Sequence, residues 1–224
     1  MEAFPDLFLI TSVIETGQRG WSYTSVRSVF TPEQRFQQTL QSIQSIREAA
    51  PEATIMICEA SPLSDSMREQ LRAAVDIALF LDADPTIQDV CLTSPKKGYG
   101  ELLQTVAAVE HLKNTGVGFR RLFKLSGRYK LNHGFRLSNF STTDFTFRAS
   151  FPGSAVHPTV LYAVPFAQLG TFENALADCR RAYETQDVVM YENALPGRCN
   201  PKHLVTSCGV SGYVAVDGVW YEDA

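Results

Sequence analysis

Short apolar runs alternate with segments of helical periodicity over the first 130 residues of the chain. Residues 7–14, 53–58, 77–81 and 121–125 are mainly apolar, as is typical of short strands covered on both faces of a sheet. Between these runs, apolar residues recur at the spacing of a helix with one buried stripe. Strands and helices that alternate in this way predict an α/β fold with a mainly parallel, doubly wound sheet flanked by helices.

Three helix starts can be recognised in this half. Thr31 is a good capping residue and Pro32 suits the first helical position, so one helix begins there. Ser64 opens a second helix that runs to about residue 74. A basic, glycine-containing turn, KKGYGE at residues 96–101, leads into a third. Residues 82–95 are predicted to form a turn and a loop.

The pattern changes beyond Lys130. Short apolar runs at residues 145–149 and 161–164 precede a helix near residues 172–185, and the chain closes on strand-like sequence. We expect this half to be a mixed, partly antiparallel extension of the same sheet. The ending VAVDGVWYEDA has no polar tail, which is consistent with a domain cut from a longer polypeptide.

Composition and charge narrow the possible partners. The chain has 224 residues, 45% of them hydrophobic, and a formal net charge of −4, so it lacks the basic footprint of a general nucleic-acid binder. No run approaches the roughly 20 apolar residues of a membrane span, and no basic signal sequence precedes residue 7. The five cysteines are widely spaced and odd in number, which favours free thiols. We expect a cytoplasmic protein.

The candidate chemistry lies directly after the predicted strands, because ligands of open α/β sheets bind beyond the carboxyl ends of the strands. These positions hold Thr11-Ser12, Glu59-Ala60-Ser61, Asp82-Ala83-Asp84 and Ser126-Gly127-Arg128-Tyr129. No dinucleotide fingerprint follows the first strand, and the sequence contains no P-loop and no G-x-S-x-G nucleophile elbow. Oxidoreductase, P-loop NTPase and hydrolase interpretations are therefore disfavoured.

The order of four segments resembles the nucleotide-sugar-binding half of GT-A glycosyltransferases, including virus-encoded enzymes that decorate capsid glycans. The segments are LITSVIETG, ICEASPLSD, KKGYGELLQ and LFKLSGRYKL, within residues 7–131. The resemblance implies a GT-A-like, Rossmann-like fold and a single glycosyltransferase domain over residues 1–224. Residues 7–131 would bind the nucleotide sugar, and residues 132–224 would form an acceptor-side extension. A virus-encoded enzyme would work in the cytoplasm of an infected host cell.

The same resemblance implies the activity and the donor-binding residues. A hexosyl or deoxyhexosyl group would move from a nucleotide-diphosphate sugar, with UDP-sugars favoured, to a glycan or glycoprotein acceptor. The first strand and its loop would hold the base, and the acid after the second strand would bind the nucleoside. The expected donor contacts are Thr11, Ser12, Glu59, Lys96, Lys97, Gly98, Tyr99, Lys124, Ser126 and Arg128.

The acidic D-x-D motif departs from the family pattern. It usually follows the strand after the glycine-turn helix, where this chain has Ser126-Gly127-Arg128, whereas Asp82-Ala83-Asp84 lies one strand earlier. Two mechanisms remain open. Asp82 and Asp84 could hold Mn²⁺ or Mg²⁺ against the diphosphate, or form only a solvated turn. In the second mechanism Arg128, with Lys96, Lys97 or Lys124, supplies the positive charge directly.

The catalytic candidates are Arg128 at the diphosphate and a carboxylate on the acceptor side. By resemblance, Asp187 and Glu192 in QDVVMYENAL are the candidate bases, and a solvated helix end is the alternative reading of both. His203 is a weaker candidate to complete a metal site. The sequence leaves the stereochemistry and the oligomeric state open.

Two other functions compete with the transferase. One is a noncatalytic glycan- or nucleotide-binding domain of a larger protein, and the other is a sugar nucleotidyltransferase, which lacks its expected early glycine-rich loop. The transferase hypothesis depends on four separated stretches converging at one rim of the sheet to bind a pyrophosphate. It fails if Glu59, Asp82, Lys97 and Arg128 are scattered over unrelated surfaces with no shared cleft.

Overall fold

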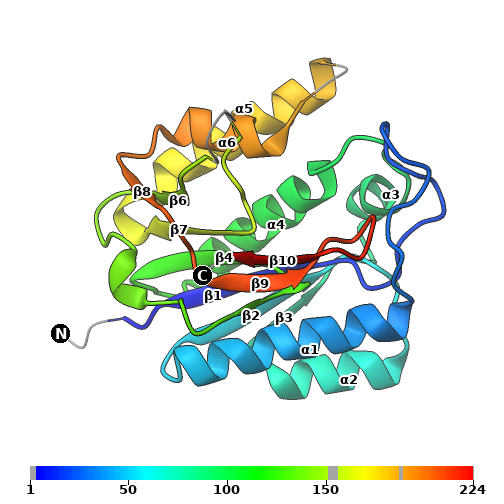
Figure 1. Ribbon diagram of the computed structural model, residues 1–224, viewed down its shortest axis with the longest axis horizontal. Helices are drawn as coiled ribbons and strands as arrows, with labels where there is room; N and C mark the ends of the chain where they lie inside the picture. Colours follow the sequence, from blue (N-terminus) through cyan, green and yellow to red (C-terminus); the bar gives the residue numbers. More distant parts are fainter. Residues whose placement is uncertain (1–3, 151–155, 187–188, 224) are drawn as a thin grey trace.

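The computed structural model describes residues 4–150, 156–186 and 189–223. A seven-stranded sheet forms the centre, with strand order β3-β2-β1-β4-β7-β6-β8 (Figure 1). Its four parallel strands are β1 (Leu7–Ser12), β2 (Thr54–Glu59), β3 (Ile77–Phe80) and β4 (Arg121–Ser126). The predicted mixed, mainly parallel α/β sheet is therefore confirmed.

Antiparallel pairing extends this sheet beyond β4. The added strands are β7 (Leu161–Pro165), β6 (Thr146–Arg148) and β8 (His203–Val205). β7 runs antiparallel to both β4 and β6, and β8 is parallel to β6. The predicted extension of the sheet is thus confirmed for these three strands.

The strand-like ending belongs to a second sheet. β10 (Trp220–Asp223), β9 (Val210–Tyr213) and β5 (Tyr129–Leu131) form a three-stranded antiparallel sheet in that order. β5 joins this sheet to α1, because the Leu131 amide donates a 3.0 Å hydrogen bond to Ser45 Oγ of that helix. The expectation that the whole second half extends one sheet was wrong in this part.

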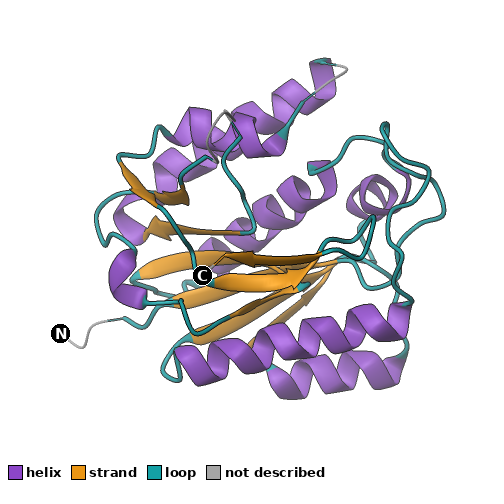
Figure 2. Ribbon diagram, in the orientation of Figure 1, coloured by secondary structure: helices purple, strands orange, loops and turns teal. Residues whose placement is uncertain are grey.

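Helices cover both faces of the central sheet (Figure 2). α1 (Pro32–Ala49) and α2 (Asp65–Ala74) lie on one face, and the other face is covered by α3 (Pro85–Thr93), α4 (Tyr99–Thr115), α5 (Leu169–Thr185) and α6 (Tyr191–Cys199). Two short 3₁₀ turns, η1 (Leu137–Asn139) and η2 (Phe166–Gln168), complete the elements. Among the described helices, none combines the length and apolarity that a bilayer crossing needs.

The two faces of the sheet bury separate cores. Successive strand residues point to opposite faces, so Phe8 and Ile10 pack toward α1 and α2, whereas Leu7 and Leu9 pack toward α4 and α5. All five cysteines are buried and free, as the sequence predicted. Because every residue of β1 and β4 is buried, the strand ends that carry the site are held in fixed positions.

Local sequence explains the helix starts. Thr31 forms a full capping box: its Oγ1 accepts from the Gln34 amide, and the Gln34 side chain accepts from the Thr31 amide. The predicted loop at residues 82–95 is wrong, because Asp84 and Pro85 begin α3 instead of closing a turn. Asp84 Oδ1 accepts from the Thr86 and Ile87 amides at 2.9 and 3.1 Å, and Pro85 takes the first helical position.

Candidate active site

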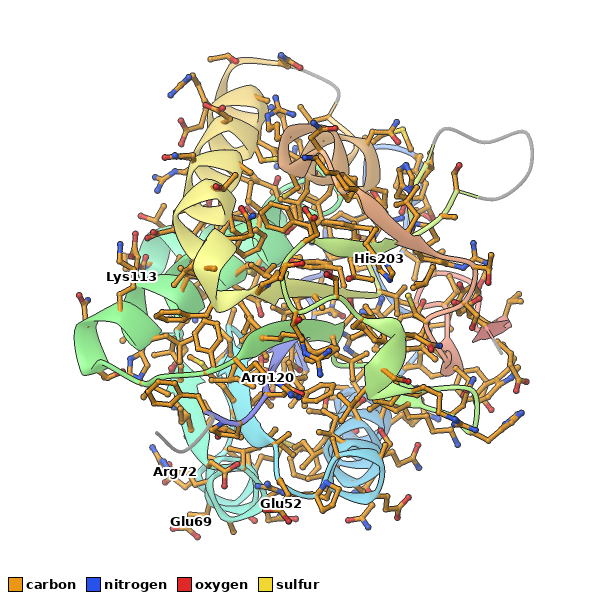
Figure 3. The ribbon with its side chains drawn as sticks, turned by 90° about the vertical axis from the view of Figure 1, so that its left-hand side faces the viewer. Glu52, Glu69, Arg72, Lys113, Arg120 and His203 are labelled. Carbon is orange, nitrogen blue, oxygen red and sulfur yellow. The ribbon has the colours of Figure 1, made fainter. Side chains whose placement is uncertain are left out.

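A pocket of about 200 Å³ opens at the carboxyl ends of β1 and β4. In the sheet register Thr11 lies beside Ser126, and the next residue, Ser12, lies beside Glu59 of β2. Thr11, Ser12 and Ser126 all line the pocket, and Arg128 follows them two residues after β4. The pocket therefore forms where sheet topology places ligand sites in open α/β folds. Figure 3 views the molecule from the opposite end, where Arg120 precedes β4.

The long loop between β1 and α1 forms one wall of the pocket through Trp21, Tyr23 and Arg27. Arg27 is buried and fixes this loop to α3: its guanidinium donates to the carbonyls of Cys91, at 3.0 Å, and Ser94. The same guanidinium lies 4.0 Å from the Trp21 ring centroid. Trp21 is thereby presented to the pocket by a rigid support.

The turn before α4 forms the opposite wall. Gly98 caps the helix in the left-handed conformation, with φ of 81°, and a Cβ at this position would lie 2.7 Å from the Tyr191 Cβ. Only glycine combines that conformation with so close an approach. The turn brings Lys97 Nζ within 3.0 Å of Glu192 Oε1 on α6. Two segments far apart in the sequence are thus joined at the pocket by an ion pair.

Arg128 reaches the pocket without an anionic partner. Its Nε is buried and has no hydrogen-bond partner within the described part of the chain. None of the ion pairs found among the described residues includes Arg128. A buried unpaired guanidinium nitrogen is costly, and a ligand oxygen would relieve that cost.

Arg35 adds a second positive charge beside Arg128. Its Nε donates to the Val13 carbonyl at 2.8 Å and its Nη1 donates to Ser28 Oγ at 3.3 Å. Burial lowers the pKa of Arg35, and the nearby positive charge of Arg128 lowers it further, while Glu59 opposes the change. The two arginines therefore create a positive field at the pocket that favours a bound anion.

Glu101 gives the pocket a second fixed carboxylate besides Glu192. Its Oε1 pairs with Lys124, a fully buried residue whose Nζ also donates to Ser126 Oγ at 2.8 Å. Burial lowers the pKa of Lys124, and the charge of Glu101 opposes that change. Lys124 thus lies beneath the pocket and orients Glu101 and Ser126 toward it.

The structure brings together part of the predicted donor site: of the four residues expected to share one cleft, Lys97 and Arg128 line the pocket, whereas Glu59 and Asp82 do not. The predicted residues that line the pocket are Thr11, Ser12, Lys97, Gly98, Ser126, Arg128 and Glu192. Lys96 instead donates to the carbonyls of Tyr183 and Gln186 at the end of α5, at 2.6 and 2.7 Å. Tyr99 stacks on Tyr183 with ring centroids 4.8 Å apart. Both side chains hold α5 in place.

Glu59 lies under the pocket rim and does not line the pocket. Its Oε1 accepts from the amides of Ile14 and Ser61, at 3.2 and 2.7 Å, and its Oε2 is buried without a partner in the described structure. Burial raises the pKa of this carboxyl, although hydrogen bonds from Ser12, Ser61 and Ile14 oppose the rise. This geometry makes Glu59 a support for the loop after β1.

Asp82 and Asp84 do not share the pocket with Lys97 and Arg128. Asp82 pairs with Arg68 of α2, and Asp84 caps α3. Asp82 Oδ2 and Asp84 Oδ1 are engaged in these contacts and neither residue lines the pocket, so the two aspartates do not form the predicted Mn²⁺ or Mg²⁺ site beside Lys97 and Arg128. Within residues 4–150, 156–186 and 189–223, no cluster of three or more acidic, histidine or cysteine residues could hold a metal ion.

His203 lies away from the described pocket. His203 Nε2 is 2.9 Å from the Asn139 carbonyl oxygen, and this histidine, labelled in Figure 3, does not line the pocket. Asp187 lies outside the described residues.

The sequence interpretation missed Arg35, Glu101 and Gln104 as lining residues. Arg35 carried a usable signal, because it directly precedes Phe36 on the buried stripe of α1 and a charge is rare there. Gln104 lies on the buried side of α4 and its Oε1 accepts from the Ser12 amide at 3.0 Å. Its position on an apolar helix face could have indicated such a contact.

The chain matches no protein family and no curated protein. Several solved structures are similar to it in fold. A glycosyltransferase involved in glycosylation of the major capsid of PBCV-1 is 8% identical with a TM-score of 0.45, over 86% of this chain and 73% of that one. An active-site mutant of LgtC is 10% identical with a TM-score of 0.49, over 88% and 71%.

A nucleoside-diphosphate-sugar pyrophosphorylase from Vibrio cholerae RC9 is also similar, with 10% identity and a TM-score of 0.46 over 90% of this chain and 93% of that one. The structural neighbours thus include both sugar transferases and a pyrophosphorylase. A functional assignment depends on the residues of the pocket itself.

Proposed function

We propose that this chain is a glycosyltransferase that moves a sugar from a nucleotide-diphosphate sugar, with UDP-sugars as the favoured donors, to a glycan or glycoprotein acceptor. The observation that carries the proposal is the unpaired Arg128 guanidinium beside Arg35, at the carboxyl ends of β1 and β4. Two adjacent cations without carboxylate partners match a diphosphate group, and arginine can contact such a group with two parallel hydrogen bonds.

The wall residues suggest how the donor lies. The nucleoside would contact the loop after β1, where Thr11, Ser12 and the Trp21 ring line the pocket. The diphosphate would then lie against Arg128, and the sugar would point toward Glu101 and Glu192. Departure of the diphosphate places negative charge at Arg128, so this residue would stabilise the transition state directly.

Glu192 is the proposed acceptor-side base. Lys97 orients its carboxylate, and the Glu192 side chain is 20% exposed, so a hydroxyl group can reach it. In a transfer that inverts configuration, Glu192 would take the proton of the acceptor hydroxyl as that oxygen attacks the anomeric carbon and the nucleoside diphosphate leaves. Asp187 remains a second candidate for this role.

Calorimetric titration with UDP-sugars and GDP-sugars, followed by assay of nucleotide release, tests the proposal. We expect saturable binding of a UDP-sugar and its slow hydrolysis when no acceptor is present. If no nucleotide sugar binds, the proposal is overturned. Binding with neither hydrolysis nor transfer would instead identify a noncatalytic nucleotide-binding domain.

A further inference from the structure

A polar groove lies next to the pocket, between α1 and the small sheet formed by β5, β9 and β10. Arg128 lines both the pocket and the narrow start of this groove. Gln41, Lys130 and Trp220 line both that start and the hollow of about 480 Å³ that follows. The shared lining residues place the groove directly beside the pocket. We name it the α1–β10 groove, defined by Gln38, Gln41, Gln44, Lys130, Tyr213 and Trp220.

Two exposed aromatic rings form one side of the α1–β10 groove. Trp220 and Tyr213 face each other in the antiparallel register of β9 and β10, and their ring centroids are 4.8 Å apart in an edge-to-face arrangement. They are 43% and 41% exposed. Two contacts hold the Trp220 indole in place. Its Nε1 donates to Glu222 Oε2 at 3.2 Å, and Lys130 Nζ lies 5.6 Å from the centroid of the ring.

Amide side chains form the other side. Gln38, Gln41 and Gln44 recur every three residues, so they share one face of α1. Gln41 and Gln44 are exposed, whereas Gln38 Oε1 is buried and has no partner in the described part of the chain. An amide carries both donors and an acceptor, and Gln44 Nε2 already donates to Glu48 Oε1 at 2.8 Å. The row therefore presents alternating hydrogen-bond groups opposite the aromatic rings.

This combination matches the chemistry of a sugar chain. The C–H groups on one face of a pyranose ring are attracted to the negative face of an aromatic ring, while its hydroxyls both donate and accept hydrogen bonds. A hydroxyl donating to Gln38 Oε1 would satisfy a buried acceptor that otherwise costs free energy. The carboxylates Glu48 and Glu222 balance the cations Lys130 and Arg128 along the groove, so its lining favours a neutral ligand.

We propose that the α1–β10 groove binds a neutral oligosaccharide acceptor, with one sugar ring on Trp220, its hydroxyls on the glutamines of α1, and its reactive end directed past Arg128 into the pocket. The inference rests on the proposed function, which it deepens by naming the acceptor class and its binding surface. It assigns Trp220 and Gln41 to acceptor binding and leaves donor binding to the pocket.

An array of neutral and acidic oligosaccharides, probed with the labelled chain, tests the assignment. We expect binding of neutral oligosaccharides that weakens about tenfold or more in Trp220→Ala and in Gln41→Ala. Phe166→Ala is the matched control, because Phe166 is similarly exposed at 51% and does not line the groove, and it should bind like the unaltered chain. Circular dichroism checks that each variant folds.

Fluorescence gives an independent measurement at the groove. The chain has two tryptophans, so Trp21→Phe leaves Trp220 as the only indole, and an oligosaccharide from the array should change its emission saturably. The proposal is overturned if the array binds no oligosaccharide, binds only acidic ones, or binds Trp220→Ala as well as the unaltered chain. UDP titration of the unaltered chain, in which Trp21 is intact, separates the two proposals: retained UDP binding without oligosaccharide binding overturns the groove alone.

Discussion

Lys97 Nζ lies 3.0 Å from Glu192 Oε1, and this ion pair links the turn before α4 to α6 across the mouth of the pocket. Burial lowers the pKa of Lys97, but the charge and hydrogen bond of Glu192 outweigh that effect, so the pKa is raised overall. Because the Lys97 side chain is 57% exposed, solvent screens the pair and its contribution to stability is small. Its importance lies in orienting the Glu192 carboxylate.

Glu192→Gln should therefore act on the reaction rate and leave donor binding intact. The amide keeps the shape of the side chain but cannot take a proton, so we expect kcat to fall by about 10²- to 10⁴-fold with an unchanged donor Kd. Steady-state kinetics and calorimetry measure the two quantities. A matched loss of donor affinity would argue that Glu192 binds the donor and would remove it as the base.

Arg128→Gln should instead weaken binding of the nucleotide. Loss of a charged hydrogen bond to the diphosphate costs about 1.5–3 kcal/mol, or roughly 10- to 150-fold in the Kd for UDP. Arg180→Gln is the control, since Arg180 is half-exposed on α5 and pairs with Glu184. Calorimetry with UDP distinguishes the two variants, and equal affinities would contradict an anion site at Arg128.

The double variant Asp82→Ala, Asp84→Ala tests the metal mechanism. Asp82 pairs with Arg68 and Asp84 caps α3, so we expect some loss of stability, of about 1 kcal/mol from the cap, and no change in UDP affinity with or without Mn²⁺. Urea unfolding and calorimetry report the two effects. A drop in affinity confined to samples with Mn²⁺ would restore these carboxylates as metal ligands.

Glu59→Gln tests whether Glu59 is a structural support. Oε1 accepts from the Ile14 amide and from the amide and hydroxyl of Ser61, so an amide side chain can keep its oxygen at this position while removing a buried charge. Because the pKa of Glu59 is raised in the folded protein, its contribution to the stability of the fold is fully present below the unfolded pKa. That contribution is lost as the pH rises through the folded pKa. The variant should therefore gain stability relative to the unaltered chain as the pH rises above about 4.5, the ordinary pKa of the carboxyl.

Urea unfolding across that pH range measures the difference for Glu59→Gln, and UDP affinity should stay constant. Glu59→Ala leaves the Ile14 and Ser61 amides without an acceptor and should destabilise the fold by about 1–3 kcal/mol for each unpaired group. A stable Glu59→Gln protein with weakened UDP binding would show instead that Glu59 contacts the nucleoside.

Asp6→Asn should destabilise the fold strongly. Asp6 accepts hydrogen bonds from Arg120 and from the buried Arg121. Burial raises the pKa of Asp6, but the hydrogen bonds and charges of the two arginines outweigh this effect, so the pKa is lowered overall. Its contribution is present above the unfolded pKa and is lost as pH falls through the folded pKa. We expect a loss of about 3–5 kcal/mol at pH 7 that shrinks in acid.

Urea unfolding at pH 7 and near pH 2 measures this loss for Asp6→Asn. The control is Asp178→Asn, because Asp178 forms an exposed pair with Arg181 within α5 and should contribute less than about 1 kcal/mol. A pH-independent difference between Asp6→Asn and the unaltered chain would contradict a charge-based role.

Periodicity predicted the parallel strands and the helix at Thr31 because those signals are local and agree with the final packing. It failed at Asp84-Pro85, since the same pair of residues is favoured in a turn and at a helix start. It also failed at α6, which contains Pro196 and Gly197, two residues that disfavour helix interiors. Burial of Tyr191 and Leu195 against α5 and the sheet overrides that preference.

The candidate site was predictable only where it follows the strand ends. Thr11, Ser126 and Arg128 could be placed at one rim because parallel strands end at the same edge. The partners of Asp82 and Lys96 depend on how distant helices pack, which no local pattern gives. The same holds for Glu101, whose position is set by a lysine buried 23 residues further along the chain.

Arg27 ties the loop after β1 to the last turn of α3 through backbone carbonyls alone, and those acceptors are present whatever side chains α3 carries. Natural variation can therefore change the side chains of α3 without loosening the loop. A graft that replaces residues 15–30 must keep an arginine at position 27, or Trp21 will lose the guanidinium that holds it at the pocket.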